Sequence, residues 1–370
     1  MTTSTSRPRL TARRRSSGIR RGEAASGWIF TAPMLILLGL FLVIPVLMAL
    51  WVSFSDWNGN GSPFSSNVKF VGTSNYQALL TGGGLSEQDF GTSLRNNAWY
   101  VVLVVPLQTA LALFLAVLVN RQILRGRGFF RTAFYFPSVT SSVAITVLWL
   151  FLFNASGAVN AVLAWFGVNG PNWFSDPSGI FHNLLAAFGI TTGPPALTGN
   201  TLLGVSYWDW LGGPSVAMTA FIIMAIFTTS GTFMLVFIAA LQNLSVEVSE
   251  AAMVDGASGW QRFWRITLPQ LRPTLFTVLT LGLIGGWQIF DQIYTGTQGG
   301  PAKTTLSPAY LSYQAAFTNQ QWGQGAAIAF ILFVIIIVFT LFQRWVLRDR
   351  PVSKRRMRRY QVTQPTEGRS

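Results

Sequence analysis

The chain has 370 residues, of which half are apolar and only a tenth are charged, and its formal net charge is +14. Soluble globular domains carry about a quarter charged residues, so this composition excludes an ordinary soluble domain and indicates an integral membrane protein. With no cysteine and a single histidine, disulfides, thiol catalysis and cysteine-ligated metals are excluded, and histidine-based sites are disfavoured. We predict no catalytic residue, no metal and no other cofactor.

Six segments are long and apolar enough to cross a membrane as helices. A crossing helix needs about 20 mostly apolar residues, because the hydrocarbon core is about 30 Å thick. The predicted spans cover residues 28–54, 97–119, 133–153, 215–241, 274–294 and 325–347. We therefore predict an all-α integral membrane fold with six transmembrane helices.

Basic residues are distributed unevenly between the loops. If the N-terminus lies in the cytoplasm, all 26 lysines and arginines fall on the cytoplasmic side except Lys69, Arg95 and Lys303. Positive flanks resist translocation, so this pattern predicts a multi-pass protein of the cell membrane with both termini in the cytoplasm. The net charge is then a topology signal, and at the tails an attraction to anionic membrane lipid, so no nucleic-acid partner is predicted.

The spans define three regions of the chain. The six-span core covers residues 28–347, and the basic tails 1–27 and 348–370 are expected to be disordered in the cytoplasm. A short apolar patch at 184–190 lies in the long outer loop 154–214. We predict a surface helix there, because a seventh span would reverse the charge pattern of every later loop.

The cytoplasmic loop between the fourth and fifth spans, residues 242–273, has the most informative sequence. It predicts a helix that begins after Ser245, a break at Gly256 and Gly259, and a second short helix. Pro269 and Pro273 then open the fifth span. A connecting loop on the membrane surface is one interpretation. A DNA-binding helix-turn-helix is disfavoured, because only three arginines occur here and both ends are tethered to membrane spans.

This loop resembles the Glu-Ala-Ala coupling loop in the membrane subunits of binding-protein-dependent ABC importers. That pattern is Glu-Ala-Ala, Asp-Gly-Ala and Ile-x-Leu-Pro, followed by a proline. The matching residues are Glu250, Ala251, Ala252, Asp255, Gly256, Ala257, Ile266, Leu268, Pro269 and Pro273. Two family positions differ, with Ser245 in place of a common proline and Ser249 in place of a frequent tyrosine.

The resemblance extends over residues 28–347 and favours the carbohydrate-uptake branch, which includes maltose and glycerol-3-phosphate permeases. Residues 294–301 end in Gly-Gly-Pro, like the turn after the fifth span in that branch, and 313–317 and 323–327 fit the approach to its last span. The outer loop at 176–214 is longer than is usual for these subunits.

The resemblance implies a permease subunit of an ABC importer for a sugar or sugar derivative. The segment from Glu250 to Ala257 would seat in a groove on an ATPase subunit and couple ATP hydrolysis to transport. The chain has no Gly-x-x-x-x-Gly-Lys-Ser/Thr motif, so ATP hydrolysis is expected on separate subunits. The implied partners are a second related permease, two ATP-binding subunits and an extracytoplasmic solute-binding protein.

Candidate residues of the solute path come from polar and aromatic side chains inside two spans. Polar groups within spans usually face the bundle interior or a cavity. In the fifth span, Trp287, Phe290, Asp291 and Tyr294 have the spacing of one helical face. The predicted path residues are Trp287, Gln288, Asp291 and Gln292 there, and Thr228, Thr229 and Ser230 in the fourth span.

Each of these groups also has a structural interpretation. The fifth-span residues could form an aromatic belt at the membrane interface. The hydroxyls of the fourth span could make hydrogen bonds between packed helices. For the function as a whole, an ABC permease for another small solute, such as glycerol phosphate or an amino acid, stays open. A non-ABC secondary transporter is disfavoured, since no repeat symmetry or set of deeply placed charges is evident.

Overall fold

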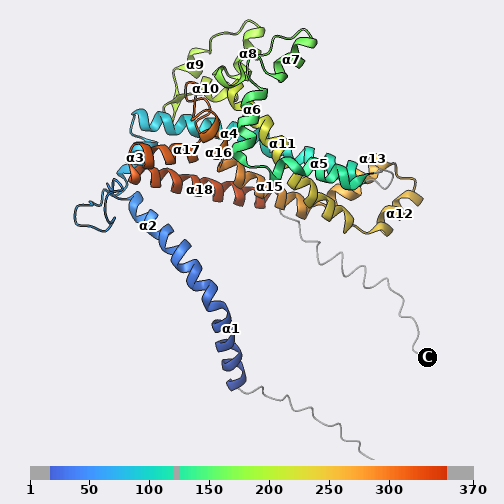
Figure 1. The fold of residues 1–370 in the computed structure, drawn as a ribbon, viewed down its shortest axis with the longest axis horizontal. Helices are drawn as coiled ribbons and strands as arrows, with labels where there is room; N and C mark the ends of the chain where they lie inside the picture. The colour runs from blue at the N-terminus through green and yellow to red at the C-terminus, as the bar shows by residue number, and fades with distance from the viewer. Residues whose placement is uncertain (1–16, 121–125, 348–370) are drawn as a thin grey trace, which may run out of the picture. The chain divides into compact units, whose positions relative to one another are not determined.

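The computed structural model describes residues 17–120 and 126–347 and is almost entirely helical (Figure 1). Within these residues, five helical segments are long and apolar enough to cross a membrane, or six if one sharply bent pair forms a single span. The one sheet in the same ranges is a hairpin of two short strands, β1 (Thr201–Leu202) and β2 (Val205–Ser206). The predicted all-α membrane fold is confirmed.

The chain divides into two compact units, Met1–Val52 and Ser53–Ser370. The first contains the N-terminal helix, which has three parts: α1 (Ser17–Leu38), the π-helical turn η1 (Gly39–Val43) and α2 (Ile44–Ser53). Its apolar part, Ala25–Ser53, matches the first predicted span. The helix begins at Ser17, within the tail expected at residues 1–27. Residues 1–16 and 348–370, where the other expected disorder and the lipid contacts of the tails fall, lie outside the described part.

The second unit contains the remaining helices. In chain order the first group is α3 (Ser74–Leu80), α4 (Leu85–Asn120), α5 (Arg127–Val139), α6 (Ser142–Leu152), α7 (Ala158–Trp165), the 3-10 turn η2 (Trp173–Ser175), α8 (Ile180–Ala187), α9 (Pro195–Thr198), α10 (Tyr207–Leu211) and α11 (Val216–Gln242). The second group is α12 (Val246–Val254), α13 (Gly259–Arg262), the π-helical turn η3 (Phe263–Thr267), α14 (Leu268–Gln270), α15 (Arg272–Trp287), α16 (Asp291–Gly296), α17 (Pro308–Tyr313), the π-helical turn η4 (Gln314–Thr318) and α18 (Trp322–Val346).

The core of this unit is the pair α4 and α11, on which α5 and α15 pack (Figure 1). Small residues allow these close contacts. Gly286 of α15 faces α4, where an added Cβ would lie 3.1 Å from the Val101 side chain, and Ala112 and Ala116 of α4 are fully buried. Small residues at helix interfaces are the usual basis of packing in a membrane, where lipid is as apolar as the side chains.

The third predicted span, 133–153, is not one straight helix. It is divided into α5 and α6, which meet at an angle of 97°. Thr140 and Ser141 adopt extended ψ angles of 145° and 132°, which turn the chain between the two helices. The Ser138 hydroxyl, next to the turn, donates to the Thr228 carbonyl oxygen of α11 at 2.5 Å. The six-span count therefore holds when this pair is taken as one broken span.

The long outer loop folds into short helices around the hairpin. The helix predicted at 184–190 is confirmed as α8, which begins earlier, at Ile180, and ends at Ala187. In Figure 1, α12 and α13 lie at the end of the second unit opposite to α3 and α17. The predicted coupling loop and α3, which lies between the first two predicted spans, are therefore at opposite ends of the helical bundle.

Gly231 provides a test of the close contact between α11 and α5. A Cβ at this position would collide with the Phe134 carbonyl oxygen of α5. We expect Gly231→Ala to lower the free energy of unfolding by about 1–3 kcal/mol, because a packed backbone must shift to make room. Thermal unfolding in detergent measures the effect. Gly285→Ala is the control, since nothing lies within 4 Å of its added Cβ; equal stability of the two variants would contradict the packing argument.

Candidate functional site

A cavity of about 270 Å³ lies between α4, α11 and the junction of α15 with α16. Five of the seven predicted path residues line it: Thr228, Thr229, Gln288, Asp291 and Gln292. The other two do not. Trp287 is only 2 % exposed and packs against Phe339 with ring centroids 5.4 Å apart, while the Ser230 hydroxyl donates to the Phe227 carbonyl of its own helix.

The fifth span is interrupted where it meets this cavity. α15 ends at Trp287 and α16 begins at Asp291, so the predicted continuous helical face from Trp287 to Tyr294 is wrong. Two consecutive glycines, Gly285 and Gly286, weaken the last turn of α15. The interruption turns the Gln288 and Asp291 side chains toward the cavity and Trp287 away from it.

Side chains from neighbouring segments donate hydrogen bonds to backbone carbonyls at this interruption. The Asn97 Nδ2 of α4 donates to the Trp287 carbonyl at 3.2 Å, and the Ser307 Oγ donates to the Ile289 carbonyl at 2.8 Å. Non-helical backbone at membrane depth is tolerated only where protein buries it or where it lines a cavity. Interrupted helices of this kind line the solute sites of many transporters.

Gln108 of α4 is a cavity residue that the sequence analysis missed. Its side chain is 2 % exposed, and its Oε1 accepts a hydrogen bond from the Thr229 Oγ1 of α11 at 2.8 Å. The Thr229 hydroxyl also contacts the Ala225 carbonyl oxygen. A single amide in the middle of the second predicted span was the available signal, since polar groups inside spans usually face the bundle interior.

The cavity offers polar groups beside an aromatic ring. The side chains of Gln288, Asp291 and Gln292 make no hydrogen bond to any other described residue, so their oxygens and amides can reach a solute. Phe290 also lines the cavity and stacks on Tyr294 with ring centroids 5.5 Å apart. Among the described residues, the cavity lining contains one carboxylate and no lysine, arginine or histidine.

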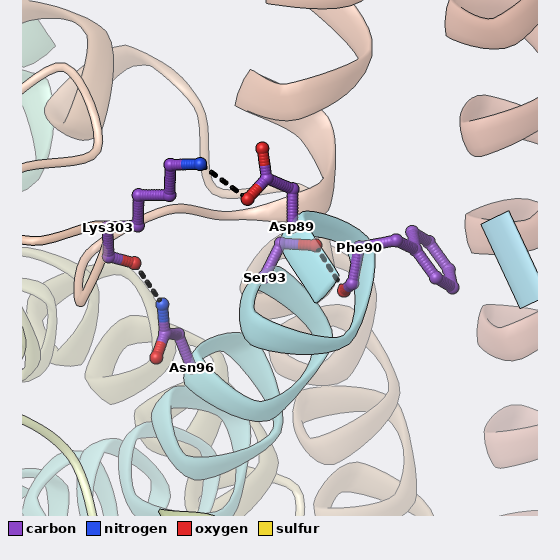
Figure 2. Close-up of polar contacts among 5 residues, drawn as sticks. All are labelled: Asp89, Phe90, Ser93, Asn96 and Lys303. Atoms are coloured by element: carbon purple, nitrogen blue, oxygen red, sulfur yellow. Dashed lines mark hydrogen bonds and ion pairs between the residues drawn. The ribbon is translucent and has the colours of Figure 1, made fainter. Parts of the chain in front are cut away.

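The loop that follows α16 is fastened to α4 by two side chains of that helix, Asp89 and Asn96 (Figure 2). The Asn96 Nδ2 donates to the carbonyl oxygens of Lys303 at 2.8 Å and Leu306 at 3.1 Å, and Lys303 Nζ forms an ion pair with Asp89 Oδ1 at 2.6 Å. The ion pair is largely exposed and contributes at most about 1 kcal/mol. The buried Asn96 amide is therefore the stronger link between this loop and α4.

The coupling loop has the predicted helix, break and helix. Gly256 has φ +78°, and the N–H groups of Gly256 and Ala257 donate to the carbonyls of Met253 and Ala252, which is a Schellman end to α12. Ser258 and Gln261 form a capping box at the start of α13. Ser245 occupies the N-cap position of α12, but its side chain makes no capping hydrogen bond.

The predicted coupling residues lie on α12 and in the turn that follows it. Glu250, Ala251, Asp255 and Gly256 are exposed, Ala257 is half-buried and Ala252 is buried. The next helix braces this surface, since an Arg262 guanidinium nitrogen donates to Ser249 Oγ at 3.4 Å. The result is a short, exposed helix that ends in a fixed backbone turn.

Comparison with known proteins identifies the family. Residues 108–350 match the family "Binding-protein-dependent transport system inner membrane component". The chain belongs to this family. It is a multi-pass membrane permease, which excludes a non-ABC secondary transporter.

Related permeases match nearly the whole chain. The lactose transport system permease protein LacF of Rhizobium radiobacter is 30% identical over 90% of this chain and 98% of its own length. The trehalose/maltose transport system permease protein MalF of Thermococcus litoralis is 29% identical, with the same two coverages. In fold, the permease is similar to a chain of a bacterial ABC transporter that imports the acidic polysaccharide alginate, with TM-score 0.66, 20% identity, and 89% and 98% of the two chains covered.

The hydrogen bond between Thr229 and Gln108 can be tested by a double-mutant cycle. Thr229→Val keeps the shape of the side chain but leaves the buried Gln108 amide unpaired, so we expect a loss of about 1–3 kcal/mol in the free energy of unfolding. Adding Gln108→Met should recover part of that loss, because both polar partners are then removed. Denaturation of the purified permease by SDS titration measures both. Thr228→Val is the control, since the Thr228 hydroxyl bonds only to carbonyls of its own helix; strictly additive losses would contradict the pairing.

Proposed function

We propose that this permease is a subunit of an ABC importer that carries a neutral sugar or sugar derivative through the cavity between α4, α11 and α15. The observation that carries the proposal is the cavity lining, in which a carboxylate and amides lie beside an aromatic ring. Sugar hydroxyls form hydrogen bonds with such oxygens and amides, and the C–H faces of sugar rings stack on aromatic side chains. The relatives named for lactose and for trehalose or maltose support the same class of solute.

The charge of the lining favours neutral sugars over the other solutes. Asp291 is the one charged residue in the described lining, and no cation faces it. A phosphate or carboxylate group would be repelled there, which argues against glycerol phosphate and against the acidic polysaccharide carried by the structural relative. An amino acid would leave its own carboxylate without a partner.

A second related permease would complete the path. Leu281, Gly285, Gln288 and Asp291 follow one side of the interrupted fifth span and are exposed, although all four also line the cavity of this chain. Polar groups exposed at membrane depth are costly. A partner permease packed against this side would bury the exposed residues and close the cavity.

The two ends of the bundle would bind the remaining partners. Two ATP-binding subunits would hold the exposed α12 of each permease in a groove, in the cytoplasm. The extracytoplasmic solute-binding protein would dock at the other end, on the outer-loop helices. This arrangement agrees with the charge pattern of the loops, which predicts both termini in the cytoplasm.

Transport by the reconstituted complex tests the function. The complex in proteoliposomes, with its ATPase subunits, second permease and binding protein, is supplied with lactose, maltose and maltotriose, and with glycerol 3-phosphate and glutamine. We expect ATP-dependent accumulation of at least one neutral saccharide, and of neither glycerol 3-phosphate nor glutamine. Uptake of only glycerol 3-phosphate or glutamine, or of no solute, would overturn the proposal.

In the same assay, Asp291→Asn should lower the transport rate at saturating loaded binding protein by about tenfold. Hydrogen bonds to a carboxylate contribute about 1.5–3 kcal/mol each, and the amide retains only part of this. Ser230→Ala is the matched control, because Ser230 is adjacent in sequence to the cavity threonines but does not line the cavity. Equal rates for the two variants would remove Asp291 from the path.

The coupling role of α12 is tested by Gly256→Val and Glu250→Lys. Valine is strained at φ +78°, and lysine reverses an exposed charge. We expect each variant to insert and assemble normally, but to transport at least tenfold less solute per ATP hydrolysed. Gly259→Ala is the control, since its added Cβ meets nothing within 4 Å. Normal uptake together with normal ATPase stimulation in both variants would contradict the proposed coupling role of α12.

A further inference from the structure

A second cavity, of about 320 Å³, lies near α3 and the start of α18, at the end of the bundle opposite to α12. Its lining includes Asp56, Trp57, Asn75, Gln320, Gln321 and Gln324. It shares no residue with the central cavity, and the lining within the described chain contains no lysine, arginine or histidine. A carboxylate, several amides and an indole are again groups that can bind a neutral solute with many hydroxyl groups.

The polar side chains of this outer cavity are of two kinds. Asp56 and Asn75 are fixed: Asp56 Oδ1 accepts from the Lys69 backbone N–H at 2.7 Å, and Asn75 Nδ2 donates to a backbone carbonyl at 2.9 Å. The side-chain amides of Gln320, Gln321 and Gln324 make no hydrogen bond to another residue of the described chain. These three amides have both donors and acceptors available for a ligand.

The Trp57 ring is held in place at the edge of this cavity. Its Nε1 donates to the Asn60 carbonyl at 3.3 Å, and its ring lies 5.3 Å from that of Trp322. Trp322 is covered in turn by Gly59 at φ +92°, where any side chain would collide with the indole. Trp57 is therefore a prearranged aromatic surface rather than a loosely placed loop residue.

A continuous chain of aromatic rings joins the outer cavity to the central one. From Trp322 the next ring is Phe317, with centroids 4.6 Å apart, followed by Tyr313 at 5.1 Å and Phe290 at 5.4 Å. Phe290 lines the central cavity. Phe317 is exposed, and together the rings run from the outer cavity to the central one.

We propose that the outer cavity is a second carbohydrate subsite, and that the aromatic chain from Trp57 to Phe290 leads a sugar from it to the central cavity. This inference rests on the proposed function. A saccharide released at the outer end would stack on Trp57, form hydrogen bonds with the glutamine amides, and move inward by exchanging one ring contact for the next. The subsite retains solute that would otherwise return to the outside.

Retention is measured as the number of sugar molecules transported per ATP hydrolysed, with the reconstituted complex and with lactose, maltose and maltotriose as probes. We expect Trp57→Ala to lower this ratio about tenfold, with an unchanged half-saturating concentration of loaded binding protein. Trp57→Phe should retain most of the ratio, because the stacking surface remains. Trp345→Ala is the matched control, since Trp345 is 72% exposed near the end of α18 and lies in neither cavity.

A second variant separates sugar binding from a structural role of Trp57. Gln324→Ala leaves every ring in place and should still lower the ratio severalfold, with an unchanged unfolding temperature. Saturation-transfer NMR on the complex without its binding protein gives a direct reading with the same saccharides. We expect the signal to fall in Trp57→Ala combined with Gln324→Ala, where only the central cavity can still bind the saccharide, and to persist in Asp291→Asn.

The other outcomes are distinguishable. If the wild-type complex takes up none of the three saccharides, the proposed function and the subsite both fail. If it takes them up and neither Trp57→Ala nor Gln324→Ala changes the ratio, the subsite is overturned and the proposed function stands. If the variants raise the half-saturating concentration of binding protein at an unchanged ratio, the cavity is a docking surface for that protein and the subsite is again overturned.

Discussion

The shortage of hydrogen-bonding water inside a membrane is the constraint on which the candidate site depends. Each unpaired backbone group there costs several kcal/mol, so a helix can be interrupted only where neighbouring side chains replace the lost bonds. Asn97 and Ser307 do this for the carbonyls of Trp287 and Ile289. The interruption turns Gln288 and Asp291 toward the cavity, so the polar lining exists because two residues far away in sequence stabilise a broken helix.

The same residues connect the cavity to the outer end of the protein. Ser307 closes the loop that begins after α16, and Asn96, the neighbour of Asn97 on α4, binds that loop through two carbonyls. The geometry of the interruption and the position of the outer loop are therefore fixed by one short stretch of α4. A change in this stretch is expected to affect both together.

Patterns local to the chain were enough to predict the membrane fold, the helix–break–helix of the coupling loop and five of the residues around the cavity. Thr228 and Asp291 could be found because polar groups stand out in apolar spans. The same signal was present for Gln108, a single amide in the second predicted span. The bend at Thr140 and the interruption after Trp287 could not be found, since each depends on what neighbouring helices supply. The predicted face from Trp287 to Tyr294 shows the reason. Helical spacing places residues on one face only if the helix is continuous, and the sequence of that segment does not show that Asn97 and Ser307 lie beside it.

The connection between the coupling loop and the cavity follows from chain order. The loop 242–273 joins α11, which carries Thr228 and Thr229, to α15, which leads into Gln288 and Asp291. Under the proposed function, a shift of α12 therefore reaches one wall of the cavity through α11 and the other through α15. The cavity threonines are about 20 Å from the end of α11, given a rise of 1.5 Å per residue. A rigid displacement of these two helices against α4 can open or close the cavity, and no separate relay of side chains is required.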